Sequence, residues 1–480
     1  MMKFRSSLIA LAALAAIGSA HALTPTEIVA ERTAGNLKEI KITGASALRL
    51  AIGGFIQADL AQPGTLDVFF NDATGANHRA YSFKTKVVIG GWPVGTPVLI
   101  TKRDAGGSGQ GVTPLLNGGD INQAHMLVNA SCSVAAGGVS PATDIQKAGF
   151  ICGTTAPALG HAGFSDVEPA LLQAGINAGT NLDTSGLDAA GFVQNIFAVA
   201  VNKKAYLALQ KAQGLDNAGA LDESAAKQPS IPKSFLIGAL TGQLLGSSAA
   251  NQKGWNLLIP ATVDSNINNK RINVCRRTPG SGTQAASNLY FANNPCGGTA
   301  NQYTPVAGTT NAVPSVLGSL TVQQGSSTQI VENCLGAVDG LADATGGGYA
   351  FGVLGRENNP LANGGDKGYR YVKISGATPT RAALISGEYD FAVESSMQWA
   401  KPGAANTPSA EILALLTKMR GEMGKASVLQ GLDADLQNGL AALPSTFTGA
   451  WAALDATTKS YTSHTNRVSA NSCSPVRMTK

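Results

Sequence analysis

The sequence lacks the features that mark several common protein classes. After its first 22 residues, no apolar run approaches the ~18 residues that a membrane-spanning helix needs. It has no G-x-x-x-x-G-K-[ST] nucleotide loop, no H-E-x-x-H pair and no C-x-x-C pair. Charged residues make up 14% and aromatic residues 6% of the 480-residue chain, while hydrophobic residues reach 44%. These values exclude a disordered chain and a membrane bundle, and they indicate a soluble globular protein of about two domains.

Glycine, by contrast, is abundant. The chain has 57 glycines in 480 residues, which is roughly 12% against a usual ~7%. No G-X-Y period accompanies them, so a collagen helix is excluded, and we expect the glycines to serve turns and close backbone approaches. The net charge of +5 falls to +3 once Lys3 and Arg5 are removed with the leader segment. This surplus is too small to indicate binding to nucleic acid or to an anionic membrane.

The first 22 residues have the pattern of a secretory signal peptide. Lys3 and Arg5 form a basic start, residues 8–17 form an apolar core, and Ala20-His21-Ala22 supplies a small-x-small cleavage site. The apolar core is too short to anchor the chain in a bilayer. We therefore predict a periplasmic protein, with secretion as the alternative, that is not inserted in a membrane after cleavage.

Six cysteines remain after this cleavage. An even number in an exported chain predicts three disulfides, and six cysteines allow 15 pairings. Their spacing does not fit a zinc site, and we expect neither a metal nor another cofactor. The pairing expected here is Cys132–Cys152 and Cys275–Cys296, with Cys334 and Cys473 left over.

Short apolar strands alternate with Gly-rich loops and Ala/Leu-rich helices from residue 37 onward. This alternation predicts α/β domains with largely parallel sheets. A disulfide-pinned excursion is expected over about residues 113–160, and a surface loop over 297–330. The expected strands are 41–43, 87–89, 98–100, 197–201, 271–274, 349–353, 369–374 and 391–393, and the expected helices are 48–60, a helix start at 112–116, 234–245, 283–291 and one that contains Ile412, Leu415, Leu416 and Met419.

The segment that runs from Arg276 to Thr283 lies between an expected strand and an expected helix. The first amides of a helix have no intrahelical partner and carry the positive end of the helix dipole. Ser281 and Thr283 can donate hydroxyl hydrogens, Gly282 allows close approach of the backbone, and Arg277 can donate a pair of hydrogen bonds to the same anion. The alternative is an ordinary helix cap with a surface arginine.

Two more strand-to-helix junctions have a similar composition. One is the Gly106–Gly111 loop, where Ser108 is the candidate donor, and the other contains Ser46 and Ala47 near the mature N-terminus. Each alone is compatible with a simple turn. Because open α/β sheets bind ligands at the carboxyl ends of their strands, the three junctions together predict one anion held from several sides.

Asp166 supplies a carboxylate directly after an expected strand. Such an aspartate is often only a helix cap. An ionised carboxylate accepts hydrogen bonds but cannot donate them, so beside an anion it favours a ligand that still carries a proton. Monohydrogen phosphate carries a proton at neutral pH and sulfate does not, which makes Asp166 a candidate for discrimination between them.

These segments, in this order, resemble the periplasmic phosphate-binding proteins of ABC transporters, which belong to the type II periplasmic binding-protein class. The resemblance covers roughly residues 40–455, and its most specific part is the Arg-x-x-Gly-Ser-Gly-Thr run. The shorter matching pieces are Ile42-Thr43-Gly44-Ala45-Ser46-Ala47, Gly107-Ser108-Gly109-Gln110-Gly111-Val112, Phe164-Ser165-Asp166, Ala200-Val201-Asn202 and Gly347-Gly348-Tyr349-Ala350-Phe351-Gly352.

The resemblance implies a two-lobed clamp that closes on its ligand. Lobe one would comprise residues 38–202 plus 389–470 and lobe two residues 203–388, with crossings near Asn202 and Tyr389. Its first loop departs from the family because Leu48 stands where a threonine hydroxyl is usual, unless Ser46 replaces that donor. By position, the ligand contacts would be Ser46, Ala47, Ser108, Asp166, Arg277, Ser281, Gly282 and Thr283.

The function that these observations predict is capture of inorganic phosphate or a similar tetrahedral oxyanion, without catalysis, by a monomer that delivers it to an ABC permease. One alternative keeps the clamp but gives it another ligand, or a role without a transporter. A second alternative is a secreted serine hydrolase. Against it, the chain has no G-x-S-x-G elbow, and Ser224-Ala225-Ala226-Lys227 matches S-x-x-K without the partner motifs of that class.

Overall fold

The computed structural model describes most of the chain from residue 22 onward. The described residues are 22–116, 118–242, 244, 254–292, 309–310, 320–340, 348–447, 450–467, 469–473 and 476–478. The signal peptide expected at residues 1–22 lies outside them, apart from Ala22. Within the described part of the chain, each helix is too short or too polar to cross a bilayer.

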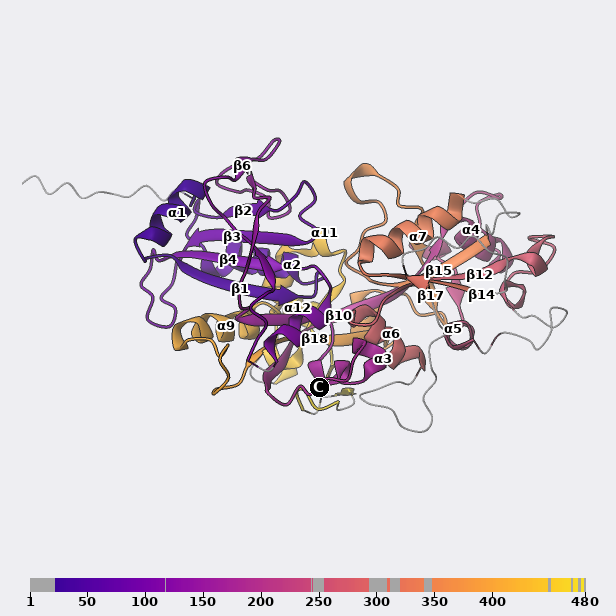
Figure 1. Cartoon of the computed structure of the whole chain (residues 1–480). Helices are drawn as coiled ribbons and strands as arrows, with labels where there is room; N and C mark the ends of the chain where they lie inside the picture. The colour runs from indigo at the N-terminus through magenta and orange to yellow at the C-terminus, as the bar shows by residue number, and fades with distance from the viewer. Residues whose placement is uncertain are drawn as a thin grey trace, which may run out of the picture.

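The molecule has two α/β lobes that share one long strand, which lies near the middle of the view in Figure 1. This strand is β10 (Leu187–Asn202). Up to Ile196, β10 pairs antiparallel with β18 (Ala392–Ala400) of lobe one. From Phe197 onward it pairs antiparallel with β15 (Gly348–Gly355) of lobe two. The two-lobed α/β architecture expected from the sequence is therefore confirmed.

Lobe one contains a mixed sheet with helices on both faces. β1 pairs parallel with β4 and with β9, whereas β4 pairs antiparallel with β3. Side chains alternate along β4, so that Val98 and Ile100 pack with α2 and α9 while Leu99 packs toward Ile28 of α1. The elements of this lobe are α1 (Pro25–Thr33), β1 (Lys38–Gly44), α2 (Arg49–Phe55), β2 (Asp67–Phe70), β3 (His78–Lys84), β4 (Pro97–Arg103), β5 (Ala124–Met126), β6 (Ser133–Val134), β7 (Phe150–Ile151), β8 (Thr155–Pro157), β9 (Ala162–Ser165), β18, α9 (Ala410–Glu422), α10 (Ala426–Gly431), α11 (Asp433–Leu436), β19 (Leu440–Ala442) and α12 (Ala456–Tyr461).

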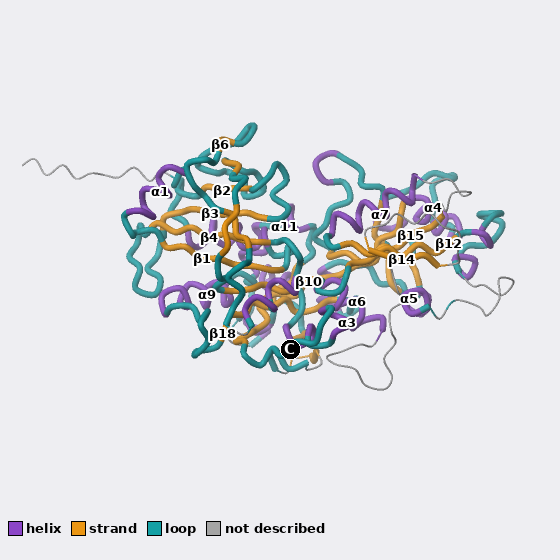
Figure 2. The backbone as a smooth tube through the Cα atoms, viewed as in Figure 1, coloured by secondary structure: helices purple, strands orange, loops and turns teal. Residues whose placement is uncertain are grey.

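Lobe two is a sheet between two helical layers (Figure 2). Its strands β13, β14, β12 and β15 run parallel, and β10 adds an antiparallel neighbour. Alternation along β12 sends Val274 into the cluster with α5 and α6 and Cys275 into the cluster with α7. Its elements are α3 (Gly175–Ala178), α4 (Lys203–Gln213), β11 (Ser230–Ile231), α5 (Lys233–Thr241), β12 (Arg271–Arg277), α6 (Gly282–Ala292), β13 (Thr309–Thr310), β14 (Leu320–Gly325), α7 (Thr328–Gly340), β15, β16 (Tyr369–Tyr371), β17 (Lys373–Ile374) and α8 (Arg381–Ser386).

The disulfides confirm one expected bridge and correct another. Cys132–Cys152 is present and pins the excursion that contains β6 and β7. Cys275 pairs with Cys334, so the expected Cys275–Cys296 bridge is wrong. The reason is that Cys275 points from β12 toward α7, where Cys334 packs in the same buried cluster. Cys473 is also disulfide-bonded and is not left over.

Three local expectations are also wrong. The surface loop expected at 297–330 contains β14, which joins the sheet because its residues pair parallel with β12. Residues 87–89 do not form a strand. Instead, Ile89 and Trp92 make one isolated bridge across a turn. The helix expected to start at 112–116 is only a 3₁₀ turn, Thr113–Leu115, because the backbone becomes extended at Leu116, at φ −82° and ψ 159°.

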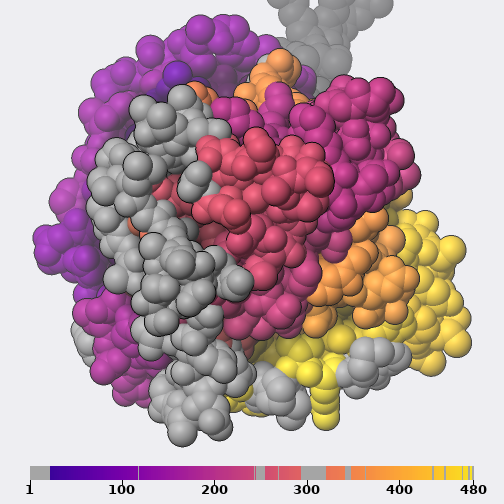
Figure 3. Space-filling model, turned by 90° about the vertical axis from the view of Figure 1, so that its right-hand side faces the viewer, coloured from indigo at the N-terminus to yellow at the C-terminus, as the bar shows by residue number. Residues whose placement is uncertain are grey.

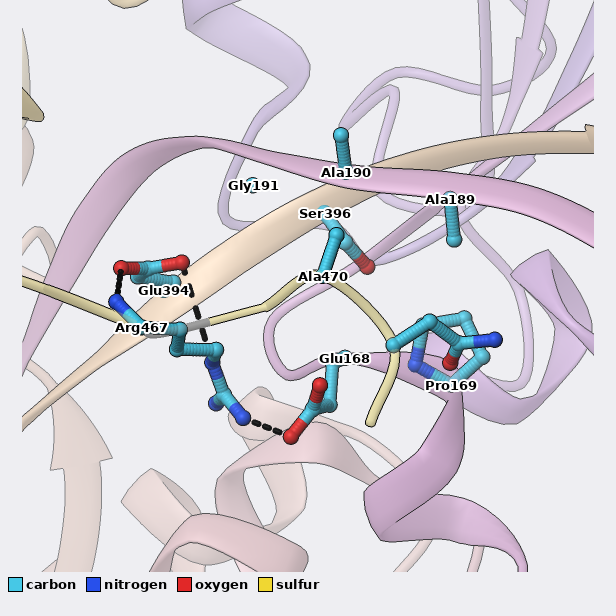
Figure 4. A pocket seen from close by; sticks show the side chains of 10 residues that line it. Glu168, Pro169, Ala189, Ala190, Gly191, Glu394, Ser396, Arg467 and Ala470 are labelled. Carbon is cyan, nitrogen blue, oxygen red and sulfur yellow. Dashed lines mark hydrogen bonds and ion pairs between the residues drawn. The ribbon is translucent and has the colours of Figure 1, made fainter. Parts of the chain in front are cut away.

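The C-terminal segment crosses the two strands that join the lobes. Its strand β20 (Thr465–Arg467) follows α12, and the Arg467 N–H donates to Glu394 Oε1 on β18 at 2.7 Å. The Arg467 guanidinium lies between Glu394, 3.7 Å away, and Glu168, with which it forms an ion pair (Figure 4). In Figure 3 this end of the chain, in yellow, lies beside lobe two residues in orange. The three charged side chains are almost fully buried, so each depends on the others for neutralisation.

Candidate anion-binding site

The centre of the candidate site is a two-way pair between Ser108 and Asp166. Ser108 follows β4 in a short 3₁₀ turn, and Asp166 follows β9. The Ser108 hydroxyl donates to Asp166 Oδ2 at 3.1 Å and accepts the Asp166 backbone N–H at 3.0 Å. Ser108 is fully buried and Asp166 is 6% exposed. Two of the expected ligand contacts from lobe one are thus held together.

The start of α6 in lobe two lies directly against this pair. A Cβ atom on Gly282 would collide with Ser108 Oγ and would lie 2.7 Å from Asp166 Cβ, so only glycine fits there. The Gly109 N–H donates to Gly280 O at 2.7 Å, which is a direct hydrogen bond between the lobes. Ser281 and Thr283 flank Gly282 and are also buried. The structure therefore brings the Gly106–Gly111 junction and the Arg276–Thr283 junction together.

Arg277 ends β12 beside the same group. Its Nη1 donates to Thr328 Oγ1 at 3.2 Å and its Nη2 to Ser326 O at 2.9 Å, while its Nε is buried and has no hydrogen-bond partner among the described residues. Burial lowers the pKa of Arg277 to about 10, an effect that the charge of Asp166 opposes. The side chain is thus a buried cation at neutral pH with one donor unused.

Asp166 is the matching buried acid. Burial raises the pKa of its carboxyl, while Arg277, the Ser108 hydrogen bond and Lys102 act in the opposite direction. Its Oδ1 atom is buried and accepts no hydrogen bond from the part of the chain that the structure describes. A buried acceptor and a buried donor without partners are both unfavourable, so a ligand that pairs with them would gain binding free energy.

The junction that contains Ser46 and Ala47 comes first in the chain and is called the first junction below. It lies against the Gly106–Gly111 loop but takes no part in the Ser108–Asp166 contact. The Thr43 hydroxyl donates to Gln110 O at 2.7 Å, and the Ala45 N–H donates to Phe164 O at 2.9 Å. Ser46 and Ala47 are half-buried, and within the described residues the Ser46 hydroxyl makes no hydrogen bond to Ser108, Asp166 or Arg277. Leu48, where the resemblance implied a threonine hydroxyl, is fully buried in the core of lobe one and offers no hydrogen-bond donor to a ligand.

A buried ion pair beneath the first junction was not anticipated from the sequence. Lys102 and Asp104, at the end of β4, have fully buried side chains 2.5 Å apart. Lys102 Nζ also donates to Gly44 O at 2.8 Å and so fixes the first junction. Burial lowers the pKa of Lys102, against the effect of Asp104. The sequence signal was two charged residues directly before the Gly106–Gly111 loop, which are easily taken for a solvated strand end.

Glu357 is a second unanticipated residue. It follows β15, and burial together with the negative charge of Asp166 raises the pKa of its carboxyl to about 7. Asn358 Nδ2 donates to Glu357 Oε1 at 3.0 Å, while Glu357 Oε2 is buried and no described residue donates to it. This region therefore holds acceptors as well as donors, which suits a ligand that carries its own proton. No three His, Cys, Asp or Glu side chains of the described chain gather to hold a metal ion.

Two cavities lie elsewhere in the described structure. One, of about 10 Å³, lies at Arg467 beneath the C-terminal segment (Figure 4) and has room for one water molecule only. The other, of about 290 Å³, is lined by residues of lobe two together with Gln437. Neither is lined by Ser108, Asp166 or Arg277. In this structure the candidate site is closed by direct contact between the lobes.

No protein-family model and no curated protein matches the chain. Among solved structures, it is similar to a phosphate ABC transporter substrate-binding protein with bound phosphate from Clostridium perfringens, at 11% identity and a TM-score of 0.39 over 83% of this chain and 98% of that one. It is also similar to an ABC-type phosphate transport receptor from Vibrio cholerae, at 10% identity and a TM-score of 0.35, over 82% of this chain and 98% of that one. A third similar structure is PstS from Borrelia burgdorferi, at 11% identity and a TM-score of 0.31, over 84% of this chain and 98% of that one. Likeness this low carries no argument about the ligand.

Proposed function

We propose that this chain is an exported solute-binding protein that captures phosphate, or a similar tetrahedral oxyanion, between its lobes and delivers it to an ABC permease. The observation that supports this most is the convergence of Ser108 and Asp166 from lobe one with Gly282 and Arg277 from lobe two. Asp166 Oδ1 and Arg277 Nε are both buried there, and neither has a hydrogen-bond partner within the described ranges. An acceptor together with charge-assisted donors suits the binding of a protonated anion. Binding of this kind needs no catalytic group.

In this proposal the lobes separate by bending of β10 and β18, and the anion enters where Gly109 and Gly280 now meet. The amides of the first turn of α6 lack intrahelical partners and lie at the positive end of its dipole, so they can bind the anion's oxygens. Arg277 then donates to the anion across the cleft. Closure of the lobes excludes water and strengthens each of these hydrogen bonds.

The hydrolase alternative receives less support from the same contacts. A serine nucleophile needs a base beside its hydroxyl, normally histidine or lysine. The Ser108 hydroxyl donates to Asp166 instead. We therefore propose that Asp166 serves recognition. As a carboxylate it accepts a hydrogen bond from the O–H of monohydrogen phosphate, and it would repel sulfate, which has no proton to donate.

Replacing Asp166 with asparagine tests this role. We expect the wild-type chain to bind phosphate and to bind sulfate at least tenfold more weakly at pH 8, where monohydrogen phosphate still carries a proton. In Asp166→Asn the ratio of the phosphate affinity to the sulfate affinity should fall at least tenfold, because the asparagine amide can donate a hydrogen bond to sulfate. Competition calorimetry measures both affinities.

The control is Asp183→Asn, because Asp183 is an exposed aspartate whose main hydrogen bond is a local one with Ser185. It should leave both affinities unchanged. An Asp166→Asn variant that rejects sulfate as strongly as the wild type would contradict the role of the carboxylate. A wild-type chain that binds no phosphate would contradict the proposed function itself.

A further inference from the structure

The 290 Å³ cavity is separate from the candidate anion site. It is lined by Arg370 and Tyr371 of β16, by Tyr206 of α4 and by Arg356, which directly follows β15. Gln437, which follows α11 of lobe one, also lines it. The volume is near the lower end of the range for small-molecule sites, about 300–1,000 Å³.

Most of the charge around this cavity is neutralised within the protein. Arg370 donates to Glu223 through Nε at 2.8 Å and to Asp366 through Nη1 and Nη2 at 2.9 and 3.0 Å. Lys203 Nζ forms an ion pair with Asp366 at 2.8 Å. The positive charges of Arg370 and Lys203 thus balance the negative charges of the two carboxylates, and this group of four side chains offers no free charge to a ligand.

Arg356 differs from this group. Its Nη1 atom is buried and makes no hydrogen bond to the described residues. The guanidinium carbon lies 4.8 Å from the centre of the Tyr371 ring, and the backbone N–H donates to Ile196 O at 2.8 Å, so the residue is held in place from two sides. Among the described residues that line the cavity, Arg356 is therefore the cation without a carboxylate partner.

We propose that this cavity binds a small organic monoanion whose carboxylate pairs with Arg356. A guanidinium can donate two parallel hydrogen bonds to a carboxylate, and Arg356 lines the cavity without a carboxylate partner among the described residues. One uncompensated positive charge suits one negative charge. Pro360, Pro379 and the exposed Leu361 give the cavity an apolar rim against which the body of the ligand can pack.

Benzoate is the probe for this proposal, with benzyl alcohol as its uncharged counterpart. Titration of the full mature chain, followed by calorimetry, should show saturable binding of benzoate and none of benzyl alcohol. Arg356→Met should weaken benzoate binding at least tenfold. Lys211→Met is the matched control, because Lys211 is an exposed cation on the neighbouring α4, and it should leave benzoate binding unchanged.

A second variant guards against misfolding of Arg356→Met. Leu361→Glu changes an exposed side chain at the rim and should weaken benzoate binding at least threefold through charge repulsion. Any of three results would overturn the proposal: no saturable binding of benzoate, equal binding of benzyl alcohol, or unchanged benzoate affinity in Leu361→Glu and in a folded Arg356→Met. None of these results bears on phosphate, so the two proposals fail separately.

Discussion

Replacing Arg277 with alanine is expected to weaken phosphate binding by about a hundredfold. Hydrogen bonds to a charged group contribute about 1.5–3 kcal/mol each, and each 1.4 kcal/mol is a factor of ten in affinity. Arg277 is 6% exposed and has one unused donor, so water replaces it poorly once the lobes have closed. Calorimetric titration of phosphate into the variant measures the change.

Two variants make this result specific. Arg32→Ala removes a half-buried arginine of α1 that pairs with Glu39, and it should leave phosphate affinity unchanged. Arg277→Lys keeps the charge but loses the paired donors, so an intermediate affinity is expected. Because Arg277 also tethers Ser326 and Thr328, thermal unfolding of each variant should accompany the titration. Unchanged affinity in a folded Arg277→Ala would remove Arg277 from the site.

Replacing Arg467 with alanine is expected to destabilise the fold by about 3–5 kcal/mol, the usual penalty for breaking a buried ion pair from one side. The variant leaves Glu168 and Glu394, which are 3% and 6% exposed, without their shared cation. Urea unfolding of the variant and the wild type measures the difference. Lys203→Ala, which breaks an ion pair of two more exposed side chains, should change stability by about 1 kcal/mol or less.

The effect of Arg467→Ala should be larger at pH 8 than at pH 5. Burial raises the pKa of Glu394 to about 7. A carboxyl whose pKa is higher in the folded state stabilises the fold below its unfolded pKa, and this contribution is lost as the pH rises through about 7. At pH 5 the Glu394 carboxyl is protonated and neutral in the folded protein, so removal of the Arg467 cation should cost less stability. An equal loss in the free energy of unfolding at pH 5 and pH 8, or a variant as stable as the wild type, would contradict this account of the C-terminal segment.

Local patterns in the sequence placed the main elements of the candidate site. The glycines and hydroxyl residues after an apolar strand predicted a helix over 283–291, and the structure has α6 at Gly282–Ala292. The same reasoning anticipated that Ser108, Asp166 and Arg277 lie close together. It succeeded because strand–loop–helix junctions are encoded within a few residues, and because parallel strands bring their carboxyl ends to one edge.

Contacts between distant segments could not be predicted in this way. Ser472 donates to Glu168 across 304 residues of chain, and nothing near either residue indicates the other. The Lys102–Asp104 pair was missed because a charged residue at a strand end is normally solvated. The pairing of Cys275 with Cys334 follows from the packing of α7 on β12, which depends on the whole sheet.

The most direct test of the proposed site is a crystal structure of the mature chain grown with phosphate. We predict one phosphate between the lobes, within hydrogen-bond distance of Arg277, of an amide in the first turn of α6 and of the Asp166 carboxylate, with the Gly109–Gly280 hydrogen bond broken. Phosphate bound only elsewhere, with Ser108, Asp166 and Gly282 still in mutual contact, would contradict the account.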